Sequence, residues 1–198
     1  HCGTVDVTED HSLLSDKREK IKPGECVVGE TKLFHCFPNE LSGEPLHLNE
    51  IVEELDKYET SIKTYEEMEA FVYGMFFGDG SCGCYDTKWG LKYTWALNNQ
   101  NNELLEQCKL YLEELYGENT KFKILDTMTS SGVNKLVPYG SIKYMVNLYR
   151  NLFYDKDKYK IVPNKILNGS YEVRKNFFMG YYAADGYKCR NTKNKNIC

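Results

Sequence analysis

The eight cysteines of this 198-residue chain include no CxxC pair. Cysteines paired at that spacing usually mark a zinc ribbon or a redox motif, so the sequence gives no sign of either. No apolar run approaches about 18 residues, and no basic, apolar and small-residue signal opens the chain. We therefore expect scattered reduced thiols in an intracellular protein, cytoplasmic or nuclear, that is neither secreted nor inserted in a membrane.

Hydrophobic residues make up 41% of the chain, which is enough for one large core or two small ones. The net charge of −4 hides a strong asymmetry along the sequence. Residues 1–119 carry 10 Lys and Arg against 24 Asp and Glu, whereas residues 120–198 carry 15 against 5. The basic part is a candidate phosphate-contacting surface, although a charge bias alone is equally typical of a solvated face.

One segment occurs twice, 106 positions apart. Residues 64–80 read TYEEMEAFVYGMFFGDG and residues 170–186 read SYEVRKNFFMGYYAADG, with six identical positions. Each copy begins with a hydroxyl residue suited to cap a helix, Thr64 or Ser170, and continues with an apolar face. The repeat predicts two like helices that form a pseudo-dimer.

Each of these helices ends in an acid that follows a stripe of small residues. The small residues recur at a four-residue interval, as Gly74 and Gly78 and as Gly180 and Ala184. Such stripes let helix backbones approach closely, which would bring Asp79 and Asp185 side by side. Carbonyl groups already make a helix C-terminus partly negative, so a cation is expected there. Two carboxylates that close either share a proton or bind a divalent metal, and oxygen-only ligands favour Mg²⁺.

Residues 72–80 and 178–186 resemble the nine-residue motif of the LAGLIDADG homing endonucleases. The resemblance implies Mg²⁺-dependent double-strand DNA cleavage with Asp79 and Asp185 as catalytic metal ligands and no further cofactor. It also implies a long asymmetric DNA target and a monomer that acts as a pseudo-dimer. An ordinary pair of apolar helices with C-cap glycines would explain Gly80 and Gly186 but not the acids before them.

Between the repeats the pattern predicts a mixed unit. We expect a strand at residues 91–97 after a turn region around Cys82 and Cys84, and a helix at residues 102–116 ending at Gly117. Two strands follow at residues 121–128 and 134–139, and then a helix capped by Ser141. With a short strand before Leu91, the order is αββαββα, as in one endonuclease half. The strands would form a saddle along the major groove, with Lys88, Lys92, Lys121 and Lys123 on or beside it.

A basic segment at residues 155–163, expected to be flexible, leads into the second repeat. In intein-borne endonucleases a Lys precedes an apolar-Pro pair at this place, and Lys160 matches that pattern. The resemblance implies that this Lys polarises the attacking water or the phosphate. Lys158 is the alternative and is also a DNA-binding candidate, and a solvated loop charge is the plain interpretation of either lysine.

The first 48 residues resemble part of an intein splicing domain. Thr8 to His11 match a Thr-x-x-His signature, and residues 20–29 resemble the strand pair that follows it. The resemblance implies that His11 protonates or distorts a scissile peptide while Thr8 positions it, in an autocatalytic acyl shift. The amino-acid sequence around Thr8 also resembles inteins of family B DNA polymerases. The expected partners therefore include the flanking segments of a host protein in the same chain, with a DNA polymerase as the suggested host.

No nucleophile precedes Thr8 at the intein spacing, no His-Asn pair ends the chain, and 12 residues follow Gly186. The resemblance is therefore to an internal fragment, and we expect this chain alone to be inactive. The expected fold is α+β: a partial all-β Hint domain at 1–48, one endonuclease half at 49–169 and the first helix of a second half at 170–198. Two rivals remain: a non-cleaving, maturase-like or regulatory nucleic-acid-binding module, and an inactive intein relic.

Overall fold

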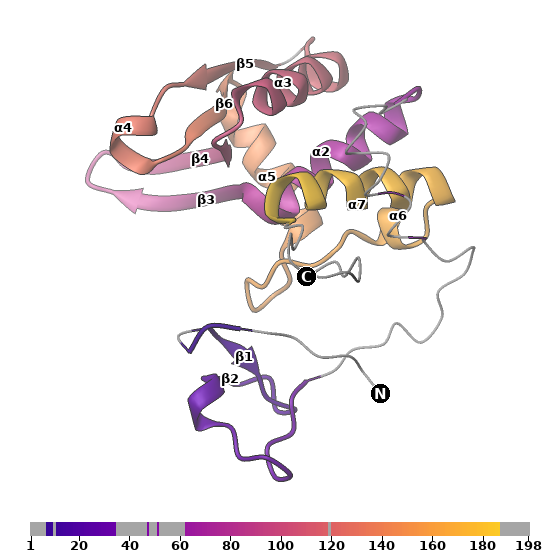
Figure 1. The fold of residues 1–198 in the computed structure, drawn as a ribbon. Coiled ribbons are helices and arrows are strands. Elements are labelled where there is room, and N and C mark those ends of the chain that lie inside the picture. Colours follow the sequence, from indigo (N-terminus) through magenta and orange to yellow (C-terminus); the bar gives the residue numbers. More distant parts are fainter. Residues whose placement is uncertain are drawn as a thin grey trace. The chain divides into compact units, whose positions relative to one another are not determined.

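The computed structural model describes residues 7–9, 11–34, 47, 51, 62–118 and 120–186. The chain divides into two compact units, His1–Leu41 and Ser42–Ile197 (Figure 1). Its fold is mixed α+β with antiparallel sheets, as the sequence predicts. Within the described ranges, no helix is both long enough and apolar enough to cross a bilayer.

The first unit is built around a two-stranded ribbon. Strand β1, Leu13–Leu14, pairs antiparallel with β2, Lys20–Ile21, and a short 3-10 helix, Pro23–Glu25, follows. The prediction of a strand pair at residues 20–29 is therefore wrong beyond Ile21. Pro23 fixes its own φ and has no N–H to donate, so it favours the helical turn that ends the strand.

The second unit begins with helix α2, Tyr65–Asp79, which runs directly into strand β3, Gly80–Thr87. Strand β4, Gly90–Asn99, helix α3, Asn102–Tyr116, and strand β5, Thr120–Leu125, come next. A short helix α4, Met128–Ser131, precedes strand β6, Asn134–Gly140, and helix α5, Ile142–Phe153. Helices α6, Asn164–Leu167, and α7, Tyr171–Asp185, close the described part.

The four strands form one antiparallel sheet in the order β3-β4-β6-β5, and the helices cover one of its faces (Figure 1). Phe76 of α2 stacks on Trp95 of β4 at 5.7 Å between ring centroids. Tyr149 and Phe153 of α5 pack against Phe76 at 4.6 and 4.9 Å. This aromatic core joins α2 and α5 to the sheet and fixes where the end of α2 lies relative to β4.

The predicted turn around Cys82 and Cys84 is wrong, because both residues lie within β3. Cys82 pairs with Trp95 and Cys84 with Tyr93, so the cross-strand ladder overrides the weak strand propensity of the Gly83 between them. A Cβ on Gly83 would lie 2.6 Å from the Tyr85 hydroxyl oxygen, which shows that the Tyr85 side chain covers this glycine. The short strand expected before Leu91 is thus a full partner of β4.

The prediction of a strand at residues 121–128 is correct only as far as Leu125. The Asp126 side chain accepts a hydrogen bond from the Met128 N–H at 3.2 Å, and the Thr127 hydroxyl donates to the Val133 carbonyl at 2.6 Å. These local bonds compete with the ladder and turn the chain into α4.

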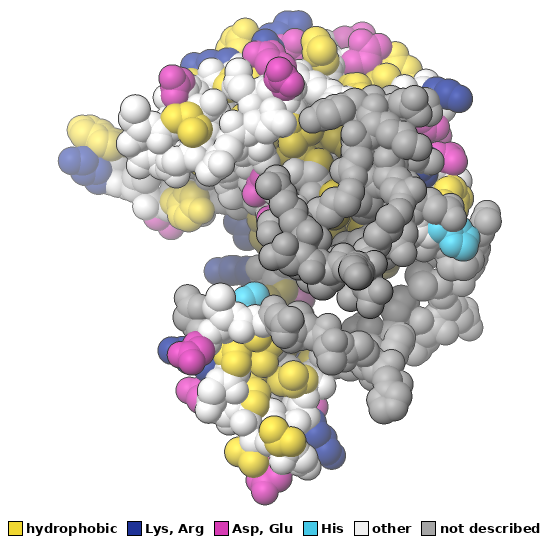
Figure 2. Space-filling view, in the orientation of Figure 1, with side chains coloured by type: hydrophobic (Ala, Val, Ile, Leu, Met, Phe, Trp, Pro, Cys, Tyr) yellow, Lys and Arg dark blue, Asp and Glu magenta, His cyan; other side chains and the backbone are white. Residues whose placement is uncertain are grey.

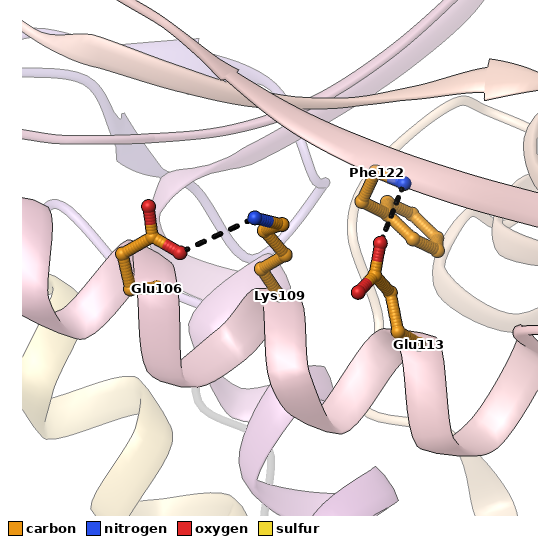
Figure 3. A network of polar contacts seen from close by, with 4 residues as sticks. All are labelled: Glu106, Lys109, Glu113 and Phe122. Carbon is orange, nitrogen blue, oxygen red and sulfur yellow. Dashed lines mark hydrogen bonds and ion pairs between the residues drawn. The ribbon is translucent and has the colours of Figure 1, made fainter.

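Strand β5 is an edge strand of the sheet, and α3 covers part of that edge (Figure 3). The Phe122 N–H donates to the Glu113 carboxylate at 3.2 Å. An unpaired backbone donor on an edge strand invites pairing with another chain. Glu113 removes one such donor from the edge.

Candidate active site at the ends of two helices

The two repeats are helices that pack against each other. The Thr64 hydroxyl accepts from the Glu67 N–H at 3.2 Å, and the Ser170 hydroxyl accepts from the Val173 N–H at 3.3 Å. Both predicted N-caps are therefore observed, and each satisfies a donor of the first helical turn. Helices α2 and α7 have 15 residues each, so equal lengths separate the caps from the terminal acids.

The four small residues lie at the contact between α2 and α7. A Cβ added to Gly74 would overlap the Phe177 carbonyl oxygen, and one added to Gly180 would overlap that of Phe71. The two backbones touch there, which leaves no room for any side chain.

Farther along the interface, the contact involves side chains. A Cβ on Gly78 would lie 2.7 Å from the Ala184 Cβ and 3.0 Å from Oδ2 of Asp185. The carboxylate of α7 is therefore beside the last turn of α2.

Gly80 and Gly186 follow the two acids in extended backbone conformation, with φ of −83° and −70°. They are not left-handed C-caps, so positive φ is not the reason for glycine here. A Cβ on Gly80 would overlap the Phe76 ring, and one on Gly186 would overlap the Tyr182 ring. Close packing against the helix's own aromatic residue requires the small residue in both copies.

Asp79 is held by two amide side chains at the end of β4. Nδ2 of Asn99 donates to Oδ2 of Asp79 at 2.6 Å, and Nδ2 of Asn98 donates to the Asp79 carbonyl at 2.8 Å. The Asn101 N–H in turn donates to Oδ1 of Asn99 at 2.8 Å, which fixes the direction of that amide. Neither asparagine is among the site residues predicted from the sequence, although the run of five amide residues at 98–102 is a visible signal.

The ionised form of the Asp79 carboxyl group is disfavoured by its surroundings. Burial raises its pKa above the usual range, and the nearby Asp185 charge raises it further. The hydrogen bond from Asn99 and the charge of Lys160 oppose this shift. Asp79 therefore lies where a cation would relieve both burial and repulsion.

Lys160 reaches the same place from the segment between α5 and α7. Its ammonium group donates to the carbonyls of Phe76, Phe77, Gly78 and Gly80 at 2.9, 3.0, 3.3 and 2.7 Å. Helix C-termini leave carbonyls unpaired and carry partial negative charge, so Lys160 neutralises the end of α2. Burial lowers the pKa of Lys160, while the carboxylates of Asp185 and Asp79 oppose that shift.

The segment that carries Lys160 is a defined turn, so the prediction of a flexible segment at residues 155–163 is wrong. The Asp155 side chain accepts from the N–H groups of Asp157 and Tyr159, both at 2.9 Å, and Tyr154 bridges to Lys160. Lys158 lies in the exposed part of this turn with a φ of 68°. Of the two lysines left open by the sequence, the structure brings Lys160 to the acids.

A cleft of about 310 Å³ opens beside Asp79. The end of β4 lines it with Asn98, Asn99 and Gln100, and α7 contributes Ala183 and Ala184. The described residues include no group of three His, Cys, Asp or Glu side chains placed to hold a metal ion. Among the described residues, Asp79 and Asp185 are the carboxylate candidates for a metal ligand here.

Three of the DNA-binding candidates, Lys92, Lys121 and Lys123, fall on the sheet face that the helices leave open. Lys158, the candidate in the turn before Lys160, belongs to no strand of the sheet. Along β4, Trp95 and Leu97 are buried under the helices while Lys92 is exposed, and in β5 Phe122 is buried while Lys121 and Lys123 are exposed. The registers Leu97↔Leu136 and Lys123↔Val137 show that Lys135 of β6 shares the open face. Alternation therefore aligns four lysines on one face, with no Asp or Glu among the strand residues there. Lys88 lies in the turn between β3 and β4.

Thr8 and His11 belong to the first unit. The His11 N–H donates to the Thr8 carbonyl at 3.0 Å, so the two residues form one turn, and both are exposed. Their expected role in splicing stays a prediction.

The paired helices, with an acid at the end of each, carry the strongest evidence for a family. The chain resembles the LAGLIDADG homing endonucleases. No protein-family model matches it. Over 194 residues, 98% of its length, it is 50% identical to a DNA polymerase of Acanthamoeba polyphaga mimivirus, and it spans 10% of that protein.

Among solved structures, a mesophilic variant of the homing endonuclease I-DmoI aligns with 63% of this chain and 64% of its own, at 17% identity and a TM-score of 0.46. The homing endonuclease I-WcaI, bound to its DNA recognition sequence, aligns with 81% of this chain and 65% of its own, at 16% identity and a TM-score of 0.40. The LAGLIDADG resemblance rests on the two motif helices of this chain and the contacts between them.

Proposed function

We propose that this chain is part of an intein-borne LAGLIDADG homing endonuclease that hydrolyses both strands of DNA at a long asymmetric site. The observation that carries the proposal is the meeting of Asp79 and Asp185 at the adjoining ends of α2 and α7, beside Lys160. A helix pair with a purely structural role would not need two acids beside each other and beside Lys160. A carboxyl group that lines a cleft and whose pKa is raised by burial, as Asp79 is, is typical of catalytic sites.

The donor set fits Mg²⁺. This ion is usually held by one or two carboxylates, with water and substrate phosphate oxygens filling the remaining positions. Asp79 and Asp185 would be the two protein ligands. A divalent ion bound there would lower the pKa of the water molecule that it holds, which makes hydroxide more available at neutral pH. It would also stabilise the leaving oxygen of a phosphodiester.

The chain's own residues would prepare this site. Asn99 donates to one Asp79 oxygen and is itself fixed by the Asn101 N–H, so it orients the carboxylate. Lys160 holds the last turn of α2 in place and brings a positive charge next to both acids. In this geometry Lys160 acts as a positioning residue, since its donors are engaged by backbone carbonyls.

Substrate binding would use the open sheet face. Lys92, Lys121, Lys123 and Lys135 present positive charge without an intervening strand acid, which suits a DNA backbone. The twisted antiparallel sheet can enter the major groove, where base edges are distinguishable. The proposed site therefore has a phosphate-binding face and, at its margin, a cleavage centre.

The same proposal includes a splicing part. We assign residues 1–48 to a partial splicing domain with Thr8 and His11, residues 49–169 to one endonuclease half, and residues 170–198 to the start of the other. The 50% identity to a DNA polymerase over 98% of this chain supports a polymerase host that supplies flanks in cis.

A non-cleaving nucleic-acid-binding module is the rival function. It would need the paired helices, the basic face and Lys160 as a donor to the end of α2, but neither acid. The placement of both acids at the adjoining helix ends favours the nuclease.

The deciding experiment incubates the longest available reading frame that contains this chain, and its Asp79→Asn variant, with a plasmid carrying a DNA polymerase gene that lacks the matched segment. Mg²⁺-dependent linearisation by the parent protein alone supports the nuclease. Equal binding by both proteins with no cutting by either, tested in the longest available reading frame, supports the non-cleaving module.

A further inference from the structure

An ion pair joins the short helix α6 to the first half of α2. The Lys165 ammonium of α6 lies 2.7 Å from Oε1 of Glu69 in α2. The Tyr73 hydroxyl donates to the same oxygen at 2.8 Å. Figure 2 shows acidic and basic side chains at the edge of the second unit where α2 begins. One carboxylate oxygen of Glu69 therefore binds a donor from its own helix and a donor from α6.

The surroundings of this ion pair restrict its geometry. The Tyr73 side chain is buried, and the Lys165 ammonium lies 4.5 Å from the centroid of its ring. The side chain of Glu69 is only 26% exposed, and Ile166, the neighbour of Lys165, is buried. Most exposed ion pairs contribute little, because both side chains stay mobile in water. A pair that shares a hydrogen bond and a cation–π contact with a buried tyrosine is held in one arrangement.

Helices α6 and α7 are joined by a tight corner. A Cβ added to Gly169 would lie 2.6 Å from Cγ1 of Val173 and 3.0 Å from the Lys165 carbonyl oxygen. The Gly169 N–H donates to the Ile166 carbonyl at 3.0 Å, and Ser170 caps α7 in the next position. The position of Lys165 therefore constrains the point at which α7 starts.

Helices α2 and α7 run in the same direction, because Gly74 lies against Phe177 and Gly78 lies against Ala184. The ion pair is therefore located where both helices begin, and the two acids lie where both helices end. Glu69 precedes the acid of α2 by ten positions, which is about 15 Å of helix at ~1.5 Å per residue. At that distance the ion pair reaches the acids only through the position of α7.

The small residues between α2 and α7 set the separation of the helices more strictly than their alignment along the axis. Where the backbones touch, no side chain of these residues interlocks with the partner helix. A polar contact that fits only one alignment can fix the register of such a pair, as a single buried Asn does in a coiled coil. A shift of one helical turn would move Asp185 by about 5.4 Å relative to Asp79.

We propose that Glu69 and Lys165 are positioning residues that fix the register of α7 on α2 and thereby hold the Asp185 carboxylate beside Asp79. This inference rests on the proposed function, because it concerns the two acids that would hold the metal ion. Glu69 and Lys165 contact neither acid. Their effect on the metal site is carried by the corner at Gly169 and by α7.

The test measures the two-carboxylate site directly and without DNA. Terbium(III), a hard cation that takes oxygen ligands, is titrated into the full chain, and its emission is sensitised by nearby tyrosine. Tyr181 is suited to this role, because burial and the nearby charge of Asp185 both raise the pKa of its hydroxyl. The double variant Asp79→Asn, Asp185→Asn gives the background signal.

Lys165→Met should weaken terbium binding about threefold to tenfold, which is less than the ~10–100-fold lost when a group beside a metal ligand is changed. The sign of this effect is diagnostic. Removing a positive charge by itself favours a bound cation, so a purely electrostatic role of Lys165 predicts tighter binding. Lys165→Arg keeps the charge and the donors and should stay close to the parent. Retained helical circular dichroism establishes that each variant is folded.

The matched control is Lys109→Met, which breaks an exposed ion pair of 3.4 Å on α3 and should not weaken terbium binding. Equal affinities of the parent and Lys165→Met, or an equal loss in Lys165→Met and Lys109→Met, would overturn the positioning role while the two-carboxylate metal site stands. A parent chain that binds no terbium above the background would overturn the metal site of the proposed function and the positioning role together.

Discussion

At the scale of single residues, the candidate site is a balance of like and unlike charges around Asp79. Its carboxylate is partly buried next to Asp185, and an amide and an ammonium group oppose the resulting rise in pKa. The acids themselves could be predicted, because each ends a repeated helix. Asn98 and Asn99 could not, because their contact with Asp79 depends on how β4 pairs with β3 twenty residues after the helix.

Asp79→Asn should lower the proposed cleavage activity by at least about a hundredfold, since even changes around metal ligands cost ~10–100-fold. DNA affinity should stay near that of the parent, because the acid serves the transition state. Cleavage and binding assays with Mg²⁺ check this. Persistent Mg²⁺-dependent cutting by the variant would contradict the assignment.

The same variant should be more stable than the parent in EDTA at neutral pH. The folded-state pKa of Asp79 is raised above its unfolded value, so ionisation opposes folding. That penalty is complete above the folded-state pKa and vanishes as pH falls to the unfolded-state value. Urea unfolding of parent and variant across this range should show a stability gain at neutral pH that disappears in acid.

Lys160→Met should lower the free energy of unfolding by about 1–3 kcal/mol, because the carbonyls at the end of α2 lose their donor. Lys158→Met is the matched control and should cost less than about 0.5 kcal/mol, as expected for an exposed surface position. Equal losses in urea titrations of the two variants would show that Lys160 does not cap the helix.

At the scale of elements, contact between α2 and α7 depends on residues too small to keep the backbones apart. Gly74→Ala should cost about 1–3 kcal/mol, since the new methyl group meets the Phe177 carbonyl. Gly78→Ala should cost less, because its new methyl group would lie 2.7 Å from the Ala184 Cβ, a smaller overlap than that of a Gly74 methyl group with the Phe177 carbonyl, and because the Asp185 carboxylate can rotate. Thermal unfolding that ranks the two variants in the opposite order would argue against backbone contact at Gly74.

The edge of the sheet gives a second element-scale prediction, with both partners visible in Figure 3. Glu113→Ala should cost about 1 kcal/mol, because the Phe122 N–H loses its acceptor. Glu106→Ala, which removes an exposed ion pair with Lys109 at 3.4 Å on the same helix, should cost less than about 0.5 kcal/mol. Urea unfolding distinguishes the two, and a larger loss for Glu106→Ala would be the contrary result.

The elements that sequence predicts well here are those whose signals are local. The caps Thr64, Ser170 and Gly117 fix three helix ends, and apolar periodicity gives α3 and α5. Strand β3 and the turn before Lys160 escape prediction. Strand β3 depends on pairing with β4, where Cys82 lies opposite Trp95, which overrides the weak strand preference of Gly83. The turn before Lys160 is held by Asp155 within the turn and by the bond from Lys160 to the carbonyl of Phe76, 84 residues away.

At the scale of the whole molecule, acidic and basic residues lie on opposite sides of the four-stranded sheet. Helix α3 carries exposed acids, among them Glu103, Glu106 and Glu114, on the covered side of the sheet, while the opposite face carries lysines. A net charge of −4 is therefore compatible with binding to DNA, because these exposed acids of α3 lie on the side of the sheet opposite to the lysines.

DNA binding by the full chain should therefore depend steeply on salt. If Lys92, Lys121, Lys123 and Lys135 each neutralise one phosphate, the logarithm of the association constant should fall with the logarithm of salt concentration with a slope of about −3 to −4, since each contact contributes ~0.9. The double variant Lys121→Ala, Lys123→Ala should flatten that slope by about 2 and weaken binding at low salt. Lys109→Ala, which removes a lysine of α3 from the covered side, is the control and should leave the slope unchanged. Anisotropy titrations at four or more salt concentrations measure all three slopes. If the double variant and the control flattened the slope equally, the open sheet face would not be the surface that meets the DNA backbone.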